Sequence, residues 1–461
     1  MKIGILPLGR PTFDVTFADE KLAAILAKLS ESDHEIVGPN QLLFDEKATN
    51  AAMAHLQSQN IEHLLLLQVT FTDASTAVAA ANAFAQPLSI WAINEPRAGG
   101  RLRLNAFCGL NLASHALGLN DRAFSWLYRD PSDVTVSDLD ALFTGQHLAG
   151  RLTAVSSEKY ASPIGAKIAA AVRGKRIARI GAHPEGFDTC AYSAAEVAAL
   201  SGVTVDALEL DDLFTSAKKA PVSAAKAARS LAAQSLADLD QVDQKELDNS
   251  LRLKAGLDSI QKKGGYDAFA IRCWPETFTE YGGAVCGPAS MLGEARVPCA
   301  CEADVYGALT QLILQEAANA PVFLTDLVDM DKADNTGVVW HCGQAPVSMC
   351  EQQHPASATI HTNRKMPLLF EFPLKAGPVT FLRISQSFNQ VKMVLGFGEM
   401  LKRPMSFTGT SGVVRFERGA GEVLDDIISS GLEHHMALAY GDHRPALRSV
   451  AAAMRLPLLE I

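Results

Sequence analysis

The sequence predicts an α/β protein with two tandem α/β domains, over residues 1–155 and 156–300, and a mostly β, barrel-like C-terminal domain over residues 301–461. Three observations predict this arrangement. Apolar strands alternate with amphipathic helices, the alternation begins again near residue 155, and β-rich segments separated by turn residues replace it beyond residue 360. A chain of 461 residues is also longer than one hydrophobic core usually spans.

In the first domain, short apolar runs alternate with segments whose apolar residues lie three and four positions apart. This rhythm is typical of a parallel sheet covered by helices. The predicted strands are 2–8, 35–40, 62–71 and 88–96, and the predicted helices are 17–32, 48–59 and 75–85. No G-x-G-x-x-G motif follows the first strand, so a dinucleotide cofactor is not predicted.

The second domain repeats the pattern, so both units are expected to be Rossmann-like. Its predicted strands are 176–184, 204–214 and 266–274, with one helix at 193–202 and two more within 221–265. The C-terminal part differs, because turn residues separate short β-rich segments there. Those segments are 359–386, 392–401 and 412–421, followed by a helix at 444–455 and a last strand at 456–461.

Composition excludes several classes of protein. Hydrophobic residues make up 48% and charged residues 20%, as in soluble globular proteins, and no apolar run approaches the roughly 18–20 residues that span a membrane. The start, MKIGILPLGR, lacks the long apolar stretch of a signal peptide, so we predict a cytoplasmic protein. The net charge of −10 argues against nucleic acid as a partner, because phosphate binding needs clustered Lys and Arg.

The eight cysteines form no C-x-x-C pair, so a cysteine-rich zinc site is not predicted. In a reducing compartment, most of them are expected to be free, buried thiols. The candidate functional side chains are therefore carboxylates and imidazoles.

Carboxylates gather in the middle of the chain. The run IRCWPETF places Trp274 and Glu276 at the end of an apolar strand, and ligands bind at the carboxyl ends of strands in open α/β sheets. Glu302 and Asp304 follow another short apolar run and open a helix. They either cap that helix, since acids favour helix N-termini, or serve a site.

Further aspartates and histidines follow. Segment 323–335, FLTDLVDMDKADN, is interpreted as a solvated loop, and it lacks the glycine of an EF-hand. Its aspartates are Asp326, Asp329, Asp331 and Asp334. His341 taken alone is interpreted as a packed strand histidine. The adjacent His434 and His435 are harder to explain by packing, because imidazoles are costly to bury without partners.

Two carboxylates and one or two histidines from different domains make a suitable oxygen and nitrogen site for a divalent ion such as Mn²⁺. Such an ion can bind neighbouring oxygens of a sugar and polarise a carbonyl. Two carboxylates on opposite sides can then move protons between C1 and C2 of the sugar.

Three segments resemble the family of L-arabinose isomerase and L-fucose isomerase, which are metal-dependent aldose–ketose isomerases. Residues 431–461, which begin GLEHHMALAYGD, are similar to an arabinose isomerase ending with a G-x-x-H-H motif, an apolar segment, a helix and a last strand. Residues 176–213 are similar to the opening of the family's second domain. LLLLQVTFTDAS, residues 64–75, resembles a first-domain strand that ends in a Thr-Phe pair.

The resemblance implies roles for the candidate residues. Glu276 and Glu302 correspond to two catalytic glutamates, which bind the metal ion and act as the acid–base pair. His435 corresponds to the C-terminal metal ligand, and His341 to an intervening metal histidine. His434 would then contact the substrate. The cofactor implied is Mn²⁺, or another divalent ion such as Co²⁺ or Mg²⁺.

Three further residues are assigned to sugar binding. Arg10 lies just after the first predicted strand and Trp274 ends the strand predicted over 266–274, both at a carboxyl edge where ligands gather. Thr70 belongs to the Thr-Phe pair. The resemblance implies a homo-oligomer, a trimer, tetramer or hexamer, in which Arg10 reaches the substrate of an adjacent protomer.

The predicted function is isomerisation of an aldose to a ketose through a cis-enediol, with a small sugar as the only expected partner beside the chain's own copies. Two alternatives remain open: a non-catalytic sugar-binding protein, and a metal-dependent lyase or epimerase on the same scaffold. The sequence leaves the sugar open. An anionic sugar would suit the arginines near the first domain's strand ends, which are Arg10, Arg97, Arg101 and Arg103.

Overall fold

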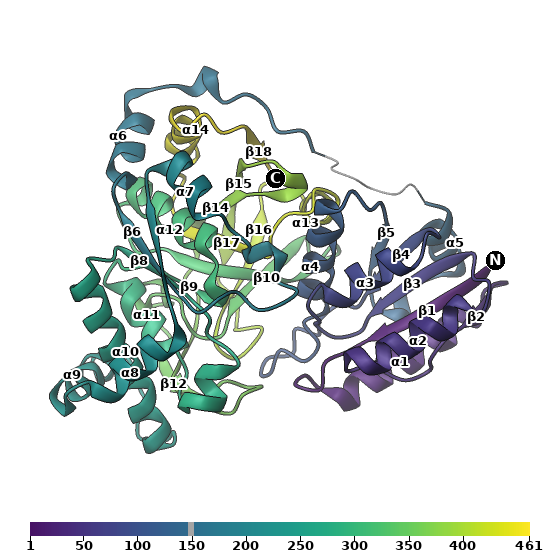
Figure 1. Cartoon of the computed structure of the whole chain (residues 1–461), viewed down its shortest axis with the longest axis horizontal. Coiled ribbons are helices and arrows are strands. Elements are labelled where there is room, and N and C mark those ends of the chain that lie inside the picture. The colour runs from purple at the N-terminus through teal and green to yellow at the C-terminus, as the bar shows by residue number, and fades with distance from the viewer. Residues whose placement is uncertain (146–151) are drawn as a thin grey trace.

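The computed structural model describes residues 1–145 and 152–461, which form two parallel sheets and one mixed sheet (Figure 1). The first sheet is parallel, with strand order β2-β1-β3-β4-β5. Its strands are β1 (Lys2–Leu8), β2 (Glu35–Val37), β3 (His63–Gln68), β4 (Leu88–Ala92) and β5 (Ser125–Tyr128). Its helices are α1 (Val15–Leu29), α2 (Glu46–Gln57), α3 (Ser75–Ala83), α4 (Ala106–Leu119) and α5 (Val136–Thr144).

Helices cover both faces of this sheet, which explains the unbroken apolar run in β3. Successive side chains of a strand point to opposite faces. Leu65 and Leu67 accordingly pack in one cluster with residues of α1 and α5. Leu64 and Leu66 pack in another with residues of α2, α3 and α4. The predicted alternation of strands and helices in the first domain is confirmed.

The second sheet is also parallel and has the order β7-β6-β8-β9. Its strands are β6 (Arg176–Ile180), β7 (Thr204–Leu208), β8 (Ala268–Ile271) and β9 (Cys299–Ala300). Its helices include α6 (Pro163–Val172), α7 (Ala194–Ser201), α8 (Leu210–Lys219), α9 (Val222–Ala233), α10 (Gln244–Gly264) and α11 (Cys286–Glu294). The strand predicted over 204–214 ends early, because Glu209 and Asp212 form a capping box that begins α8.

The C-terminal strands close into a ring. β16 pairs with β11, followed in order by β10, β17, β14 and β15, and β15 pairs again with β16. The strands are β10 (Phe323–Asp331), β11 (Thr336–His341), β12 (Ser357–Thr359), β13 (Leu369–Pro373), β14 (Gly377–Ser385), β15 (Lys392–Leu401), β16 (Thr410–Phe416), β17 (His435–Tyr440) and β18 (Leu458–Glu460). This ring confirms the barrel-like prediction.

Two corrections concern this part of the chain. Segment 323–335 is no loop, because most of it is strand β10, and Asp326 and Asp329 are buried there. The segment 412–421, predicted as β-rich, leaves the strand at Phe416 and enters helix α13 (Ala420–Ser429). A second helix, α14 (Arg444–Ala453), packs against α6 as well as the barrel strand β15.

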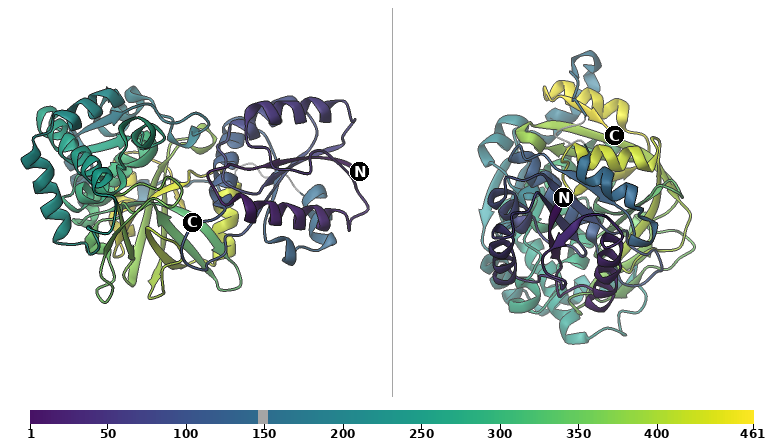
Figure 2. Two further views of the ribbon diagram at one scale, coloured as in Figure 1. Left: turned by 90° about the horizontal axis from the view of Figure 1, so that it is seen from below. Right: turned by 90° about the vertical axis from the view of Figure 1, so that its right-hand side faces the viewer.

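Helix α12 (Val305–Ala318) joins the second sheet to the barrel. It contacts β8 on one side and β14 and β17 on the other, and its residues from Val305 to Gln315 are all buried. Figure 2 shows the first domain as a lobe on one side, the second sheet with its helices on the other, and the C-terminal strands between them. No helix among residues 1–145 and 152–461 is long and apolar enough to span a membrane.

Glu95 fixes the segment that leads from β4 to α4. Its carboxylate accepts backbone N–H bonds from Arg103, Leu104 and Asn105 at 2.6–2.9 Å. Burial raises the pKa of Glu95 to about 7, although these hydrogen bonds act in the opposite direction. The segment is also tied to the barrel, because Asp329 of β10 accepts from the backbone N–H of Glu95 at 3.3 Å.

The raised pKa predicts a pH-dependent stability. A group whose pKa is raised on folding stabilises the folded state below its unfolded pKa, and this contribution is lost as the pH rises through the folded pKa. The pKa of Glu95 rises from the ordinary value of 4.5 to about 7 on folding. This shift corresponds to a loss of about 3 kcal/mol in the free energy of unfolding as the pH rises. We therefore expect Glu95→Gln, which keeps an acceptor and cannot ionise, to gain stability relative to the wild type between pH 5 and pH 8. Urea unfolding of both proteins at each pH measures this, and a pH-independent difference would contradict it.

Candidate active site

Segments distant in sequence meet at one group of side chains. Glu302 follows β9, Asp326 lies on β10, and His435 begins β17. Antiparallel pairing of β10 and β17 places Asp326 directly opposite His435. Nε2 of His435 consequently lies 3.4 Å from Oδ1 of Asp326 and 3.8 Å from Oε2 of Glu302. Two carboxylates and an imidazole thus converge from two different sheets.

The backbone at Glu302 is strained. Glu302 and Ala303 have φ angles of 58° and 57°, in the left-handed region. For residues with a side chain, this conformation costs about 1–2 kcal/mol each. Such strain gathers at functional sites. The two strained residues lie in the short turn between β9 and α12, and this turn places the Glu302 carboxylate in the group.

Two side chains hold the Glu302 carboxylate. The indole Nε1 of Trp274 donates to Oε1 at 2.9 Å, and Nε2 of His434 lies 3.0 Å from Oε2. Burial by itself raises the pKa of Glu302, but the hydrogen bond and charge of His434 outweigh it and lower the pKa to about 2. Burial by itself lowers the pKa of His434, but the hydrogen bond and the charge of Glu302 outweigh burial, so the pKa of His434 is raised. Glu302 is therefore ionised at neutral pH.

Asp304 fixes the orientation of His435. Its carboxylate accepts from Nδ1 of His435 at 3.0 Å and from both terminal nitrogens of Arg383. Burial raises the pKa of Asp304, but Arg383 and His435 hold it well below its usual range. An ionised Asp304 keeps the imidazole proton on Nδ1. The lone pair of Nε2 therefore faces Asp326 and Glu302, as in the carboxylate–histidine pairs behind metal ions.

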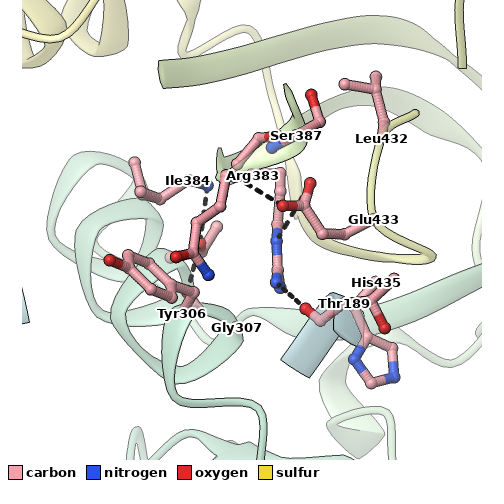
Figure 3. A network of polar contacts seen from close by, with 12 residues as sticks. Thr189, Tyr306, Gly307, Arg383, Ile384, Ser387, Leu432, Glu433 and His435 are labelled. Atoms are coloured by element: carbon pink, nitrogen blue, oxygen red, sulfur yellow. Dashed lines mark hydrogen bonds and ion pairs between the residues drawn. The ribbon is translucent and has the colours of Figure 1, made fainter. Parts of the chain in front are cut away.

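Arg383 is the centre of a buried polar network (Figure 3). Its Nη2 donates to the carbonyl oxygen of Thr189 at 3.0 Å, and its Nε lies 4.0 Å from Oε2 of Glu433. Its side chain is only 1% exposed, and that of Asp304 is 0% exposed. One guanidinium thus compensates two buried carboxylates next to the histidine pair.

Several buried polar atoms near His435 make no hydrogen bond to the described residues. They are Oδ1 of Asp326, Nε2 of His341 and Nδ1 of His434. Among residues 1–145 and 152–461, two groups have ligand atoms within 4.8 Å of one another, as a metal ion requires. They are Asp326, His341 and His435, and Cys190, Glu302, His434 and His435. His435 belongs to both, so it is the common point of a potential site.

Cys190 is the weakest ligand of these groups. Its thiol is buried, and burial together with the charges of Asp304 and Glu302 raises its pKa well above the usual value. A neutral thiol is a poor ligand for a divalent ion, which binds thiolate. The remaining donors are oxygen and nitrogen atoms, a set that suits Mn²⁺, Co²⁺ or Mg²⁺.

A pocket with a cavity volume of about 100 Å³ opens onto this group and is lined by all three parts of the chain. The first domain contributes Arg10, Thr12, Phe13, Phe71, Leu102, Asn105 and Cys108. The second contributes Phe187 and Trp274, and the later segments contribute Cys301, Glu302, Asp326, Trp340, His341, Cys342, His361, Asn363, Arg364 and His434. Small-molecule sites combine aromatic side chains with a few convergent polar groups, and this lining has both.

The structure brings together most of the residues singled out in the sequence. Glu302, His341, His434, His435, Trp274 and Arg10 all belong to the pocket or to the group that it reaches. Arg10 lines the pocket of its own chain, whereas the sequence suggested a neighbour's. Thr70 lies outside the lining, where its hydroxyl accepts from the backbone N–H of Arg10 at 2.8 Å.

Glu276 is not brought into this group. Its carboxylate forms an ion pair with Arg272, four residues earlier, with contacts of 2.6 and 2.8 Å. It belongs neither to the pocket lining nor to the two potential ligand groups. Asp326 occupies the place beside His435 and Glu302 that the sequence assigned to Glu276.

The sequence left open whether His341 or a nearby aspartate is a ligand and did not single out Asp326, and it gave no role to Arg383, His361, Asn363 or Arg364. A signal existed for Asp326, because it stands in a segment of apolar residues with β-branched members, as a buried strand does. Arg383 sits in the apolar run TFLRIS, where a charged residue needs a buried partner. The loop residues carried no comparable signal.

Family comparisons match both ends of the chain. Residues 4–144 match the family described as fucose/sulfoquinovose isomerase, N-terminal domain. Residues 339–461 match L-fucose isomerase, C-terminal domain. Among curated proteins, sulfoquinovose isomerase of Clostridium sp. (strain MSTE9) is 30% identical over 464 residues, covering 99% of this chain and 98% of the relative. The sulfoquinovose isomerase of Alkalicoccus urumqiensis is 29% identical and covers 99% of this chain and 98% of the relative. That of Priestia aryabhattai is also 29% identical and covers 95% of this chain and 94% of the relative.

A comparison with solved structures found an ABC transporter solute-binding protein from Burkholderia multivorans. It is 10% identical, covers 69% of this chain and 94% of that chain, and gives a TM-score of 0.20. A likeness this low carries no argument about fold or function, so it does not favour the sugar-binding alternative.

Proposed function

Because the chain belongs to the fucose/sulfoquinovose isomerase family, and so is an intramolecular oxidoreductase, we propose that it converts sulfoquinovose to its ketose with a bound divalent ion. Glu302, Asp326 and His435 would hold the ion, with His341 beside them. Mn²⁺, Co²⁺ or Mg²⁺ would suit these donors. The observation that carries the proposal is the convergence of Nε2 of His435, Oδ1 of Asp326 and Oε2 of Glu302.

The distances support an ion at this point. Ligand atoms that each lie about 2.1 Å from a divalent ion are roughly 3–3.5 Å apart. The separations of 3.4 and 3.8 Å from His435 Nε2 approach that range. Buried ligand atoms that make no hydrogen bond within the described residues support it as well, because a carboxylate oxygen without a hydrogen bond in the interior is costly.

The carboxylates of Glu302 and Asp326 would transfer the protons that the isomerisation moves. When bound, the ion would polarise the carbonyl and the neighbouring hydroxyl of the open-chain sugar. Ionised Glu302 can accept a proton from C2, and Asp326 can exchange protons with the sugar oxygens, so that the proton returns at C1 through a cis-enediol. His434 and Trp274 would keep the Glu302 carboxylate in place by their hydrogen bonds.

The choice of sulfoquinovose rests on two independent supports. The full-length relatives are named sulfoquinovose isomerases. The pocket also contains two guanidinium groups, those of Arg10 and Arg364, which suit the sulfonate of this sugar. The other arginines suggested by the sequence serve structure: Arg97 pairs with Asp329, Arg103 pairs with Asp14, and Arg101 bonds Asn363 and Thr12.

Metal removal and product analysis test the proposal. Dialysis against EDTA should lower the turnover of sulfoquinovose at least about 100-fold, because the ion contributes several kcal/mol to the transition state, and Mn²⁺ or Co²⁺ should restore it. NMR should identify the ketose, and in D₂O its C1 should carry deuterium. L-Fucose and L-arabinose serve as comparison substrates.

The other outcomes separate the alternatives. Binding of the sugar without any product would favour a sugar-binding protein. A C2 epimer or a cleaved carbon chain would favour an epimerase or lyase. Full activity in protein shown to be metal-free would end the proposed role of the ion. A homo-oligomer remains a prediction, which light scattering would test.

A further inference from the structure

One end of the pocket is built from a short loop between β12 and β13. Nδ1 of His361 accepts from the backbone N–H groups of Asn363 and Arg364, both at 3.2 Å. The backbone N–H of His361 donates to Met366, and its carbonyl accepts from Lys365. The loop is therefore held by its own hydrogen bonds, and its side chains reach the pocket from a fixed backbone.

These hydrogen bonds leave donors facing the pocket. Because Nδ1 of His361 accepts, the ring proton is on Nε2, and burial lowers the pKa of His361 to about 3, so the ring is neutral. Oδ1 of Asn363 accepts from Nε of Arg101 at 2.8 Å, which leaves the Asn363 amide as a donor. His361 and Asn363 thus offer N–H groups, and their acceptor atoms are already used.

Arg364 adds a positive charge that the protein does not compensate. Its half-buried guanidinium makes no hydrogen bond or ion pair with any residue in the described parts of the chain, 1–145 and 152–461. It lies over the rings of Trp274 and Phe278, with Cζ 5.3 and 5.9 Å from their centroids. The other guanidinium of the pocket differs, because Arg10 is paired with Asp73 at 2.6 Å.

We propose that His361, Asn363 and Arg364 form a subsite for the sulfonate at C6 of the substrate, and that Arg364 determines the preference for a sulfonated sugar. The inference rests on the proposed function and names the residues behind its substrate. A sulfonate has three acceptor oxygens, a single negative charge and no proton to donate. A subsite with donors, one uncompensated cation and no free acceptor matches these properties.

Trp274 places this subsite at the correct end of the sugar. Its Nε1 bonds the Glu302 carboxylate, where C1 and C2 would react, and its ring lies beneath Arg364. One side chain therefore spans the distance between the two ends of the site. A six-carbon chain whose C6 meets Arg364 would extend along Trp274 toward Glu302.

Kinetics with two sugars test the specificity. The pair is sulfoquinovose and 6-deoxy-D-glucose, which differ only by the sulfonate. Arg364→Gln should lower kcat/KM for sulfoquinovose about 10- to 100-fold, the usual effect of losing charge-assisted hydrogen bonds, and leave 6-deoxy-D-glucose unchanged. Arg364→Lys keeps the charge but loses the paired N–H donors of the guanidinium, so its kcat/KM for sulfoquinovose should lie between those of the wild type and Arg364→Gln. Arg415→Gln, at an exposed arginine of β16, is the matched control and should not change either value. An equal loss for both sugars, or no loss, would overturn the proposal.

Binding of sugar alcohols, which have no carbonyl to isomerise, tests the sulfonate subsite independently of the proposed isomerase activity. The probes are 6-deoxy-6-sulfo-D-glucitol and 6-deoxy-D-glucitol, open-chain alcohols without a carbonyl, titrated by calorimetry into Mn²⁺-loaded protein. The wild type should bind the sulfonated alcohol at least about 10-fold more tightly, and Arg364→Gln should abolish the difference. If the wild type shows this preference but forms no ketose, the isomerase proposal fails and the subsite stands. If it forms ketose but binds both alcohols equally, the subsite is wrong.

Discussion

Asp326→Asn is expected to lower the turnover of the substrate by about 1,000-fold or more, and to lower the bound metal from its wild-type content. The change removes a negative ligand and a proton carrier while keeping the shape of the side chain. Asp326 lies opposite His435 across the β10–β17 ladder, and its Oδ1 accepts no hydrogen bond from the part of the chain that the structure describes. Loss of its charge therefore acts on the ion and the reaction, with little effect on packing.

Glu276→Gln is the matched control, because it makes the same chemical change at the carboxylate that the sequence suggested. Glu276 pairs with Arg272 near the surface, and exposed ion pairs contribute about 0–1 kcal/mol. We expect its turnover and metal content to stay near those of the wild type, measured by steady-state kinetics and elemental analysis. The opposite result, an active Asp326→Asn and an inactive Glu276→Gln, would restore the pairing inferred from the sequence.

The second large effect concerns stability. Arg383→Met should lower the free energy of unfolding by about 3–5 kcal/mol, because it leaves Asp304 as a buried, unpaired charge. Both partners are almost fully buried, with side-chain exposures of 1% and 0%. Asp304 also orients His435, so metal affinity should fall as well.

Arg403→Met provides the comparison for Arg383→Met. Arg403 also forms a forked pair, with Asp334, but the two side chains are 37% and 33% exposed. Its loss should cost about 1 kcal/mol or less. Thermal and urea unfolding of both variants, with metal bound and removed, measure the difference. Equal small losses would show that the buried network does not stabilise the fold, and normal metal affinity in Arg383→Met would separate Arg383 from the site.

The order of strands and helices was predictable because it follows from local patterns. The run of four leucines in β3 and the amphipathic α1 each show the period of one element, and two such units in series predict two parallel sheets. Boundaries were less predictable where a capping interaction decided them, as at Glu209, or where a second pattern began, as in α13. The His434–His435 pair and Glu302 were recognisable because polar groups of this kind need partners once they are buried.

The sequence by itself determined the α/β order and the barrel-like end, and it singled out the imidazoles and one carboxylate of the candidate site. Only the tertiary structure decided that Asp326 completes the group and that Glu276 lies outside it. The reason is register: the β10–β17 pairing sets Asp326 opposite His435, and no local pattern specifies which strands pair. The same holds for Arg364, whose surroundings come from Trp274 and Phe278 in a different domain. Whether a charge is paired depends on long-range contacts, and only the folded chain contains them.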